Sequence, residues 1–274
     1  MIFSANTMTT RPDHDMHTAP ASKGRLALAF LLLFAAYQLP EGLGGHILHS
    51  FPVQAALMIA FLPIAWLVGR WLGYPGLGAW YLGLRPGWSL LLAAAFGLAL
   101  LAKIAALAVG SGAGVYSIAF PPGLAAGAIF LSVLTLLPET FIPSIAEDIV
   151  TRGFLMRALP ALSRRRLFIV CSALLFTLNH IYRYQQGALE LGRIFCFGLA
   201  YAAALYYSRS LWAAVGLHWG WNFAGQLGDR VADIELLDPL LGPALSSLAH
   251  LAMLGVVVLA AGRRPRPGAT ILPV

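Results

Sequence analysis

Long apolar runs that contain almost no charge dominate the sequence and limit the chain to one kind of fold. A helix needs about 20 apolar residues to cross the hydrocarbon core of a bilayer, and most of these runs approach that length. The runs are continuous rather than alternating, which argues against a transmembrane β-barrel. We therefore predict an all-α polytopic membrane bundle of about eight transmembrane helices, at residues 26–45, 51–69, 88–109, 124–160, 167–182, 194–208, 211–226 and 243–262.

The composition and the distribution of charge support an integral, multi-pass membrane protein. Only 11% of the residues are charged, whereas a soluble domain carries about 25%. The net charge of +7 comes from basic residues in loops and tails, which the positive-inside rule explains without nucleic acid. An even number of spans puts both termini on the same side, and the basic loops and tails predict that this side is the cytoplasm. We expect a disordered cytoplasmic tail at 1–24, a single membrane-embedded domain at 25–262 and a basic tail at 263–274.

The run at 124–160 is too long for one straight span and contains Pro138 and Pro143. Proline removes a backbone donor and kinks or breaks a helix. We expect one helix, a break at 139–143, and a second helix from about residue 144. Ser144 could then cap the second helix, with Glu147 completing a capping box, which is a purely structural role for this glutamate.

Three clusters of polar residues interrupt the second half of the apolar sequence. A charge in hydrocarbon costs several kcal/mol, so such residues usually serve a function. The clusters are Glu147, Asp148 and Arg152, then Phe176 and His180, then His218 and Asn222.

The spacing of these residues allows them to meet. With a rise of about 1.5 Å per residue, Glu147, His180, His218 and Asn222 lie roughly 14–21 Å from the cytoplasmic ends of their helices, at Pro160, Arg166 and Arg209. They can therefore share one depth in a core about 30 Å thick.

Helical periodicity also pairs residues inside each cluster. Positions four apart share a helix face, and the pairs are Asp148 with Arg152, Phe176 with His180, and His218 with Asn222. Asp148 and Arg152 can form a supporting ion pair, which leaves Glu147 free to face a cavity.

Together these groups could hydrolyse a peptide bond inside the membrane. Hydrolysis needs a base that activates water and donors for the developing oxyanion. Glu147 can be the base, His180 can position or deprotonate the water, and His218 and Asn222 can donate to the oxyanion. Alternatively, Glu147, His180 and His218 could ligate a divalent metal such as zinc, whose bound water attacks. No HExxH pattern decides between the two mechanisms.

The motifs Glu-Asp-x-x-x-Arg, Phe-x-x-x-His and His-x-x-x-Asn, in this order over residues 140–225, resemble those of a known family. They are similar to the CPBP family (CAAX prenyl protease and bacteriocin-processing, or Abi-like) of intramembrane metalloproteases. The resemblance implies an intramembrane endopeptidase that acts on a peptide or lipidated protein entering from the cytoplasmic side. It assigns the water-activating role to Glu147, a partner role to His180, and a structural role to Arg152. It assigns the oxyanion site or metal neighbourhood to His218 and Asn222. Asp148 departs from the family, which usually has a second glutamate there.

Two other functions remain open from the sequence. A non-catalytic membrane scaffold or bacteriocin-immunity protein could keep the same fold, and a transporter could use buried acids and histidines as a proton relay. No internal repeat supports a transporter. Cys171 and Cys196 lie in apolar segments and suggest neither a disulfide nor a nucleophile. The expected partners are substrate and membrane lipid, without nucleic acid, and no pattern indicates an oligomeric state.

Overall fold

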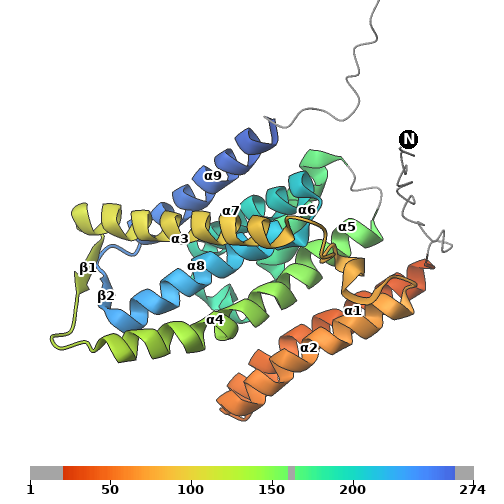
Figure 1. Ribbon diagram of the computed structural model, residues 1–274, viewed down its shortest axis with the longest axis horizontal. Coiled ribbons are helices and arrows are strands. Elements are labelled where there is room, and N and C mark those ends of the chain that lie inside the picture. Colours follow the sequence, from red (N-terminus) through yellow and green to blue (C-terminus); the bar gives the residue numbers. More distant parts are fainter. Residues whose placement is uncertain (1–20, 160–163, 263–274) are drawn as a thin grey trace, which may run out of the picture.

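A computed structural model describes residues 21–159 and 164–262 of the chain (Figure 1). Most of the disordered tail predicted at 1–24 and the basic tail predicted at 263–274 lie outside the described residues, and a helix already begins at Lys23. Among the described residues the chain is almost entirely helical, as predicted for an all-α membrane bundle.

The long helices follow the predicted apolar runs closely. They are α1 (Lys23–Leu39), α2 (Phe51–Trp71), α3 (Trp88–Gly112), α4 (Ala126–Asp148), α6 (Arg165–Asn179), α7 (Gly187–Ser208), α8 (Leu211–Val231) and α9 (Leu241–Gly262). Shorter helical segments are η1 (Pro40–Ile47), η2 (Gly76–Trp80), η3 (Ile149–Gly153), α5 (Phe154–Ala158) and η5 (Ile181–Gln186).

Six helical segments of the described residues are long and apolar enough to cross a membrane. We expected about eight, and the two that do not qualify are α6 and α8. α6 has only 15 residues. α8 has 21 residues but carries His218, Asn222, Asp229 and Arg230. A helix enclosed by other helices need not be apolar on every face, because its polar groups meet protein instead of lipid.

α8 is that enclosed helix and forms the centre of the bundle. It packs against α3, α4 and α7 (Figure 1), and most of its residues from Leu211 to Ala224 are buried. Gly216 and Gly220 let α3 approach closely, since a side chain at either position would meet the backbone of α3 at Leu92 or Phe96. The close approach fixes the depth and rotation of the α8 face that carries His218.

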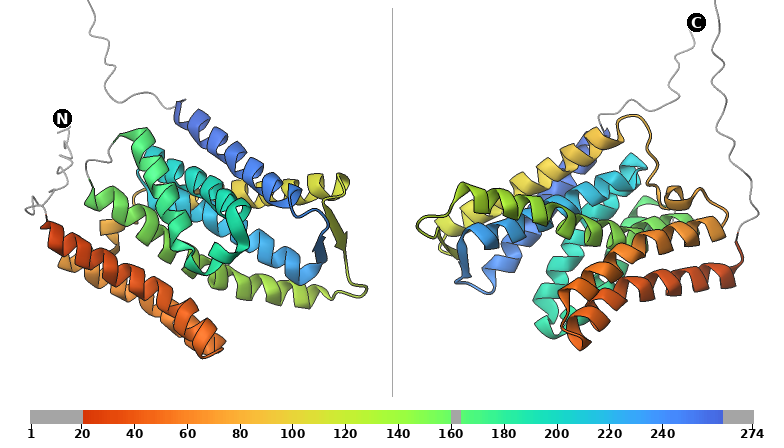
Figure 2. Two further views of the ribbon diagram at one scale, coloured as in Figure 1. Left: turned by 180° about the vertical axis from the view of Figure 1, so that it is seen from behind. Right: turned by 60° about the horizontal axis from the view of Figure 1, so that its bottom comes forward.

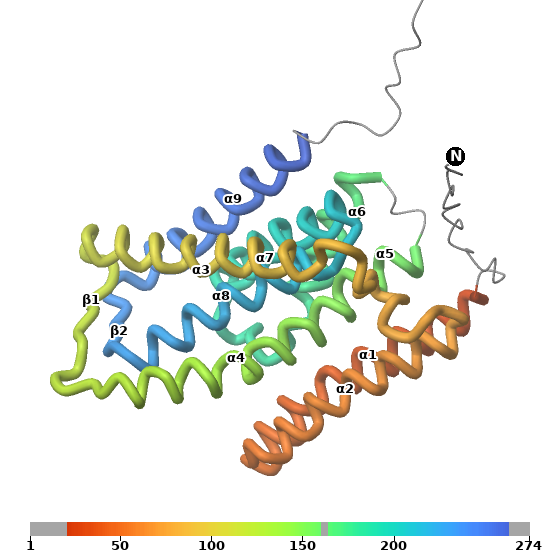
Figure 3. Tube along the Cα trace, viewed as in Figure 1, coloured from red at the N-terminus to blue at the C-terminus, as the bar shows by residue number. Residues whose placement is uncertain are grey.

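α1 and α2 form an antiparallel hairpin beside this bundle, and the two views of Figure 2 keep it next to α4 and α5. The Cα trace in Figure 3 shows that α9 lies on the opposite side, across α7. The hairpin therefore brings the end of α1, which belongs to the first half of the chain, towards the polar clusters of the second half.

The expected break at 139–143 is wrong, because α4 continues from Ala126 to Asp148 through both prolines. The indole nitrogen of Trp219 donates at 3.1 Å to the Leu137 carbonyl and to the Thr140 hydroxyl oxygen, and so holds the segment around the first proline against α8. Neighbouring helices of this kind make proline tolerable in membrane helices. Ser144 is not a cap either, since its hydroxyl donates to the Thr140 carbonyl at 2.8 Å within the helix.

The chain departs from α-helical geometry only after the end of α4, at η3, which is one turn of π-helix. Phe154 bonds back five residues to the Ile149 carbonyl. Ser172 of α6 donates to the Thr151 carbonyl at 3.0 Å, which satisfies a backbone acceptor in this wider turn. Single π turns occur frequently at functional sites, and this one directly follows Glu147 and Asp148.

A small antiparallel sheet, which the sequence did not indicate, joins two of the loops. β1 (Tyr116–Ala119) pairs with β2 (Asp233–Leu236), so that Tyr116 lies opposite Leu236. The sheet ties the end of α3 to the end of α8, far along the chain from each other.

Candidate active site

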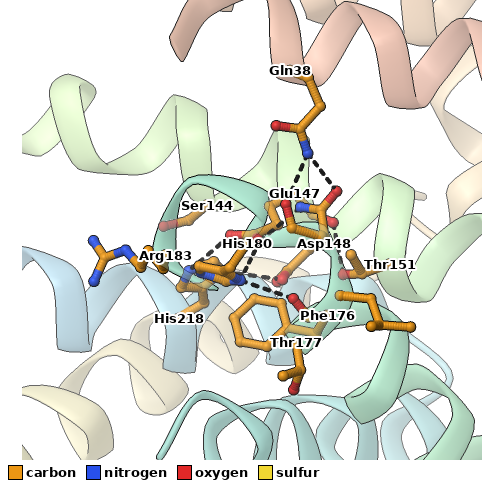
Figure 4. A network of polar contacts seen from close by, with 12 residues as sticks. Gln38, Ser144, Glu147, Asp148, Thr151, Phe176, Thr177, His180, Arg183 and His218 are labelled. Carbon is orange, nitrogen blue, oxygen red and sulfur yellow. Dashed lines mark hydrogen bonds and ion pairs between the residues drawn. The ribbon is translucent and has the colours of Figure 1, made fainter. Parts of the chain in front are cut away.

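Glu147 lies where three separate helices meet, as the predicted convergence requires (Figure 4). Its side chain is at the end of α4 and the residue is only 4% exposed. One carboxylate oxygen, Oε1, is 3.4 Å from Nδ1 of His180, which follows α6. The other, Oε2, is 3.7 Å from Nε2 of His218 on α8. Each carboxylate oxygen therefore faces a different imidazole.

The His180 ring is fixed in one tautomer by the backbone. Its Nδ1 lies 2.8 Å from the Phe176 carbonyl, and since a carbonyl only accepts, Nδ1 carries the proton. This N–H lies close to two acceptors, the Phe176 carbonyl oxygen and Glu147 Oε1. Nε2 is then the nitrogen with a free lone pair, and the side chain is 20% exposed. His180 is thus the member of the cluster most accessible from outside.

His218 is oriented from its opposite edge by Asp148. Nδ1 of His218 lies 3.1 Å from Asp148 Oδ1, which turns Nε2 towards Glu147. The ring also stacks on Tyr201 of α7, with centroids 5.0 Å apart and planes 21° apart. A carboxylate on the second nitrogen is a common way to fix the tautomer and direction of a histidine.

Asp148 and Arg152 form the predicted ion pair, entirely inside the protein, with both side chains 0% exposed. The Arg152 guanidinium lies 4.3 Å from the centre of the Phe176 ring and 5.1 Å from that of Tyr201. Asp148 Oδ2 and the Nε and Nη2 atoms of Arg152 have no hydrogen-bond partner among the described residues. The pair is therefore held by one oxygen of a short aspartate, where a glutamate would extend further.

Phe176 packs at the centre of the cluster, as expected from its spacing to His180. Its ring meets the His180 ring edge-on at 4.7 Å and the His218 ring edge-on at 5.6 Å. The residue is 1% exposed, and its ring also lies against the Arg152 guanidinium.

Asn222 lies on the same face of α8 as His218 but does not contact Glu147 directly. Its amide nitrogen is 3.4 Å from the Ser144 hydroxyl, which belongs to α4 one turn before Glu147. The amide therefore lines the approach to the carboxylate rather than its immediate surroundings.

Two residues that the sequence reasoning did not assign complete the surroundings of Glu147. Asn179 donates its amide hydrogen to Glu147 Oε1 at 2.9 Å. Gln38, at the end of α1, donates to the Asn179 side-chain oxygen at 3.1 Å and to its carbonyl at 2.8 Å. The sequence does show Gln38 as a lone amide in an apolar span, which is typical of a functional residue. Spacing along the chain could not predict that Asn179 is its partner.

A second layer lies behind His218. The Tyr201 hydroxyl is 2.9 Å from Nε2 of His250, while Nδ1 of His250 lies 2.8 Å from the Ser246 carbonyl. His250 Nε2 therefore accepts a hydrogen bond from the tyrosine hydroxyl. Through this contact α9 helps to hold the ring on which His218 stacks.

The side chains as placed do not form a metal site. Among residues 21–159 and 164–262, no group of three histidine, cysteine or acidic side chains is arranged to hold an ion. Glu147 Oε1 already accepts from Asn179, and Nδ1 of His180 is committed to the Phe176 carbonyl. Two nitrogens, one on each histidine, remain as donors for a metal.

Residues 128–224 match a family model described as Type II CAAX prenyl endopeptidase Rce1-like. All three motifs lie within the matched residues. No curated protein and no solved structure matches the chain. The match supports a membrane endopeptidase in general. Over residues 128–224 the chain is Rce1-like, which confirms its resemblance to the CAAX-prenyl-protease and bacteriocin-processing proteases.

Proposed function

We propose that this protein is an intramembrane endopeptidase in which Glu147 activates a water molecule. The water attacks a peptide bond of a membrane-associated or lipidated peptide or protein. One observation carries the proposal: the Glu147 carboxylate is buried between the imidazoles of His180 and His218, at 3.4 and 3.7 Å, on separate helical segments.

The first step transfers one proton from water to Glu147 while the water oxygen attacks the carbonyl carbon. Asn179 and the Nδ1–H of His180 lie beside Oε1, which leaves Oε2 as the less occupied oxygen for the incoming proton. General-base catalysis of this kind contributes about 10²–10⁴-fold to a rate. Nε2 of His180 can accept a hydrogen bond from the same water.

The second step breaks the carbon–nitrogen bond of the tetrahedral intermediate. Its oxyanion needs donors, which the amide of Asn222 and, when the ring is doubly protonated, Nε2 of His218 can supply. Glu147 then returns its proton to the leaving amine, so the products are a carboxylic acid and an amine. Arg152 and Asp148 act through His218, because Asp148 fixes its ring and Arg152 fixes Asp148.

The replacement of the family's second glutamate by Asp148 fits this mechanism. Asp148 Oδ1 contacts both the Arg152 guanidinium and Nδ1 of His218, so it positions groups and does not need to reach the substrate. This supports a catalytic protein over a scaffold of the same fold.

Comparison of the membrane peptides released in cells with the wild-type protein and with Glu147→Ala tests the proposal. We expect a set of cleaved peptides that disappears in the variant, while the protein remains in the membrane. A phenotype that persists in Glu147→Ala without any lost cleavage product would instead identify a scaffold.

The mechanism runs through Glu147 and water without a metal, and metal analysis tests this part separately. We expect purified wild-type protein and His180→Ala to contain the same background of zinc, and chelators to leave turnover unchanged. Stoichiometric zinc that is lost in His180→Ala would contradict the metal-free mechanism but not the endopeptidase assignment.

A further inference from the structure

A cavity of about 680 Å³ lies away from the candidate active site, at the arginine-rich end of the bundle. We call it the basic pocket, and its walls come from the loop before α3, from α5 and from the turn between α7 and α8. Its lining includes Arg85, Arg157, Arg209, Tyr81, Trp88 and Ser210. No acidic side chain lines it, and none of its three arginines forms an ion pair with a carboxylate of the described residues.

Arg157 is held rigidly in the wall of the basic pocket. Its guanidinium lies 4.5 Å from the ring centres of both Tyr74 and Tyr81. Its Nε donates to the Ala79 carbonyl at 2.9 Å, and no described residue accepts from its two terminal amino groups. A fixed guanidinium with free amino groups is well suited to bind phosphate oxygens.

The backbone adds positive electrostatic potential to the same place. α3 and α8 both begin at the basic pocket, after Gly87 and Ser210. The first N–H of each helix donates to a backbone carbonyl, but neither helix has a side-chain hydrogen bond at its N-cap. Helix N-termini present free N–H groups and favour anions. The two helix starts therefore reinforce the three arginines.

A second cavity, of about 350 Å³, adjoins the basic pocket and is lined almost entirely by apolar side chains. We call it the apolar groove; it lies between α3, α7, α8 and α9. Leu91 and Ser208 line both cavities. On α3 the groove extends from Leu91 to Leu98, a rise of about 10 Å from the helix start into the bundle.

We propose that the two cavities together bind one anionic phospholipid, with its phosphate in the basic pocket and part of an acyl chain in the apolar groove. The arginines and helix starts select a phosphate group, and the apolar continuation selects a lipid over a free phosphate ion. No residue that lines either cavity belongs to the catalytic cluster, so the lipid site is separate from that cluster. The proposal does not depend on proteolysis.

The test is a titration of the purified full-length protein in detergent with dioleoylphosphatidylglycerol, followed by native mass spectrometry. We expect Arg85→Gln combined with Arg209→Gln to weaken binding by about 25-fold, from about fivefold for each basic residue near a lipid surface. Arg70→Gln is the matched control, because Arg70 lies at the end of α2 over Trp66 and does not line the pocket.

The groove is tested with a second pair of variants. Ala94 lines the apolar groove and is exposed, whereas its neighbour Ala93 is exposed and does not line it. We expect Ala94→Phe to weaken lipid binding at least about tenfold, by excluding several methylene groups, and Ala93→Phe to leave it unchanged. Inorganic phosphate at millimolar concentration should not displace the lipid.

Three results would overturn the proposal. Equal weakening by Arg70→Gln would show unspecific attraction to basic surface. Displacement by inorganic phosphate together with no effect of Ala94→Phe would show a phosphate site without a lipid tail. Unchanged binding in both pocket and groove variants would remove the site altogether.

Discussion

Replacing either partner of the Asp148–Arg152 ion pair should destabilise the protein strongly, whereas replacing both together should cost less than either single change. Both side chains are 0% exposed, and the aspartate is the one carboxylate within ion-pair distance of this arginine among the described residues. Arg152→Met would leave a buried carboxylate unpaired, and Asp148→Asn would leave a buried guanidinium unpaired. Neither charge can reach water.

The structure sets the size of these effects. Breaking a buried ion pair on one side costs about 3–5 kcal/mol of unfolding free energy. The double variant carries no charge at either position and loses mainly the contact of the guanidinium with Phe176 and Tyr201, which is about 0.5–2 kcal/mol. The asparagine oxygen can still accept the hydrogen bond from Nδ1 of His218, so this contact need not be lost.

The assay is reversible unfolding of the purified protein in mixed micelles, followed for the four members of the double-mutant cycle. The Glu139–Arg230 pair is the matched control, since it also starts from α4 and spans 3.1 Å, but its side chains are 31% and 45% exposed. Exposed pairs contribute about 0–1 kcal/mol. The reasoning is refuted if Asp148→Asn costs no more than Glu139→Gln, or if the double variant costs as much as the sum of its single changes.

Two further predictions concern the surroundings of Glu147 and the packing of α8. Asn179→Ala should lower kcat about tenfold with little change in KM, because it removes the 2.9 Å hydrogen bond to Glu147 Oε1; an unchanged kcat would exclude a role in orienting the base. Gly220→Ala should lower the unfolding free energy by about 1–3 kcal/mol, because the added methyl group meets the Phe96 backbone. Gly97→Ala, where no atom lies within 4 Å, should stabilise the helix by about 0.5–1 kcal/mol. Thermal unfolding of both variants compares their unfolding free energies. An equal change in Gly220→Ala and Gly97→Ala would contradict the close packing of α3 on α8.

Much of the fold could be predicted from the sequence because lipid imposes simple requirements. The run at 51–69 became α2, and the run at 88–109 became α3, since each long apolar segment must satisfy its backbone hydrogen bonds internally. The prediction failed where tertiary contacts override local rules. Trp219 holds α4 through its two prolines, and no local pattern reveals a contact from α8.

The contacts of the candidate site likewise fall into those that the sequence predicted and those that it could not predict. Spacing four residues apart predicted the contacts of Asp148 with Arg152 and of Phe176 with His180. The contacts of Glu147 with Asn179 and of Asn179 with Gln38 join residues far apart in the chain, so helix periodicity could not predict them. The catalytic roles of Glu147, His180, His218 and Asn222, and the orientation of the termini, remain predictions.

The most direct test of the central claim is the turnover of a lipidated peptide by purified Glu147→Gln protein. The amide keeps the shape of the side chain and can still accept from Asn179, but it cannot take a proton from water. We predict that kcat falls by about 10²–10⁴-fold, while Glu139→Gln on the same helix keeps wild-type turnover. Wild-type turnover in Glu147→Gln would contradict the account.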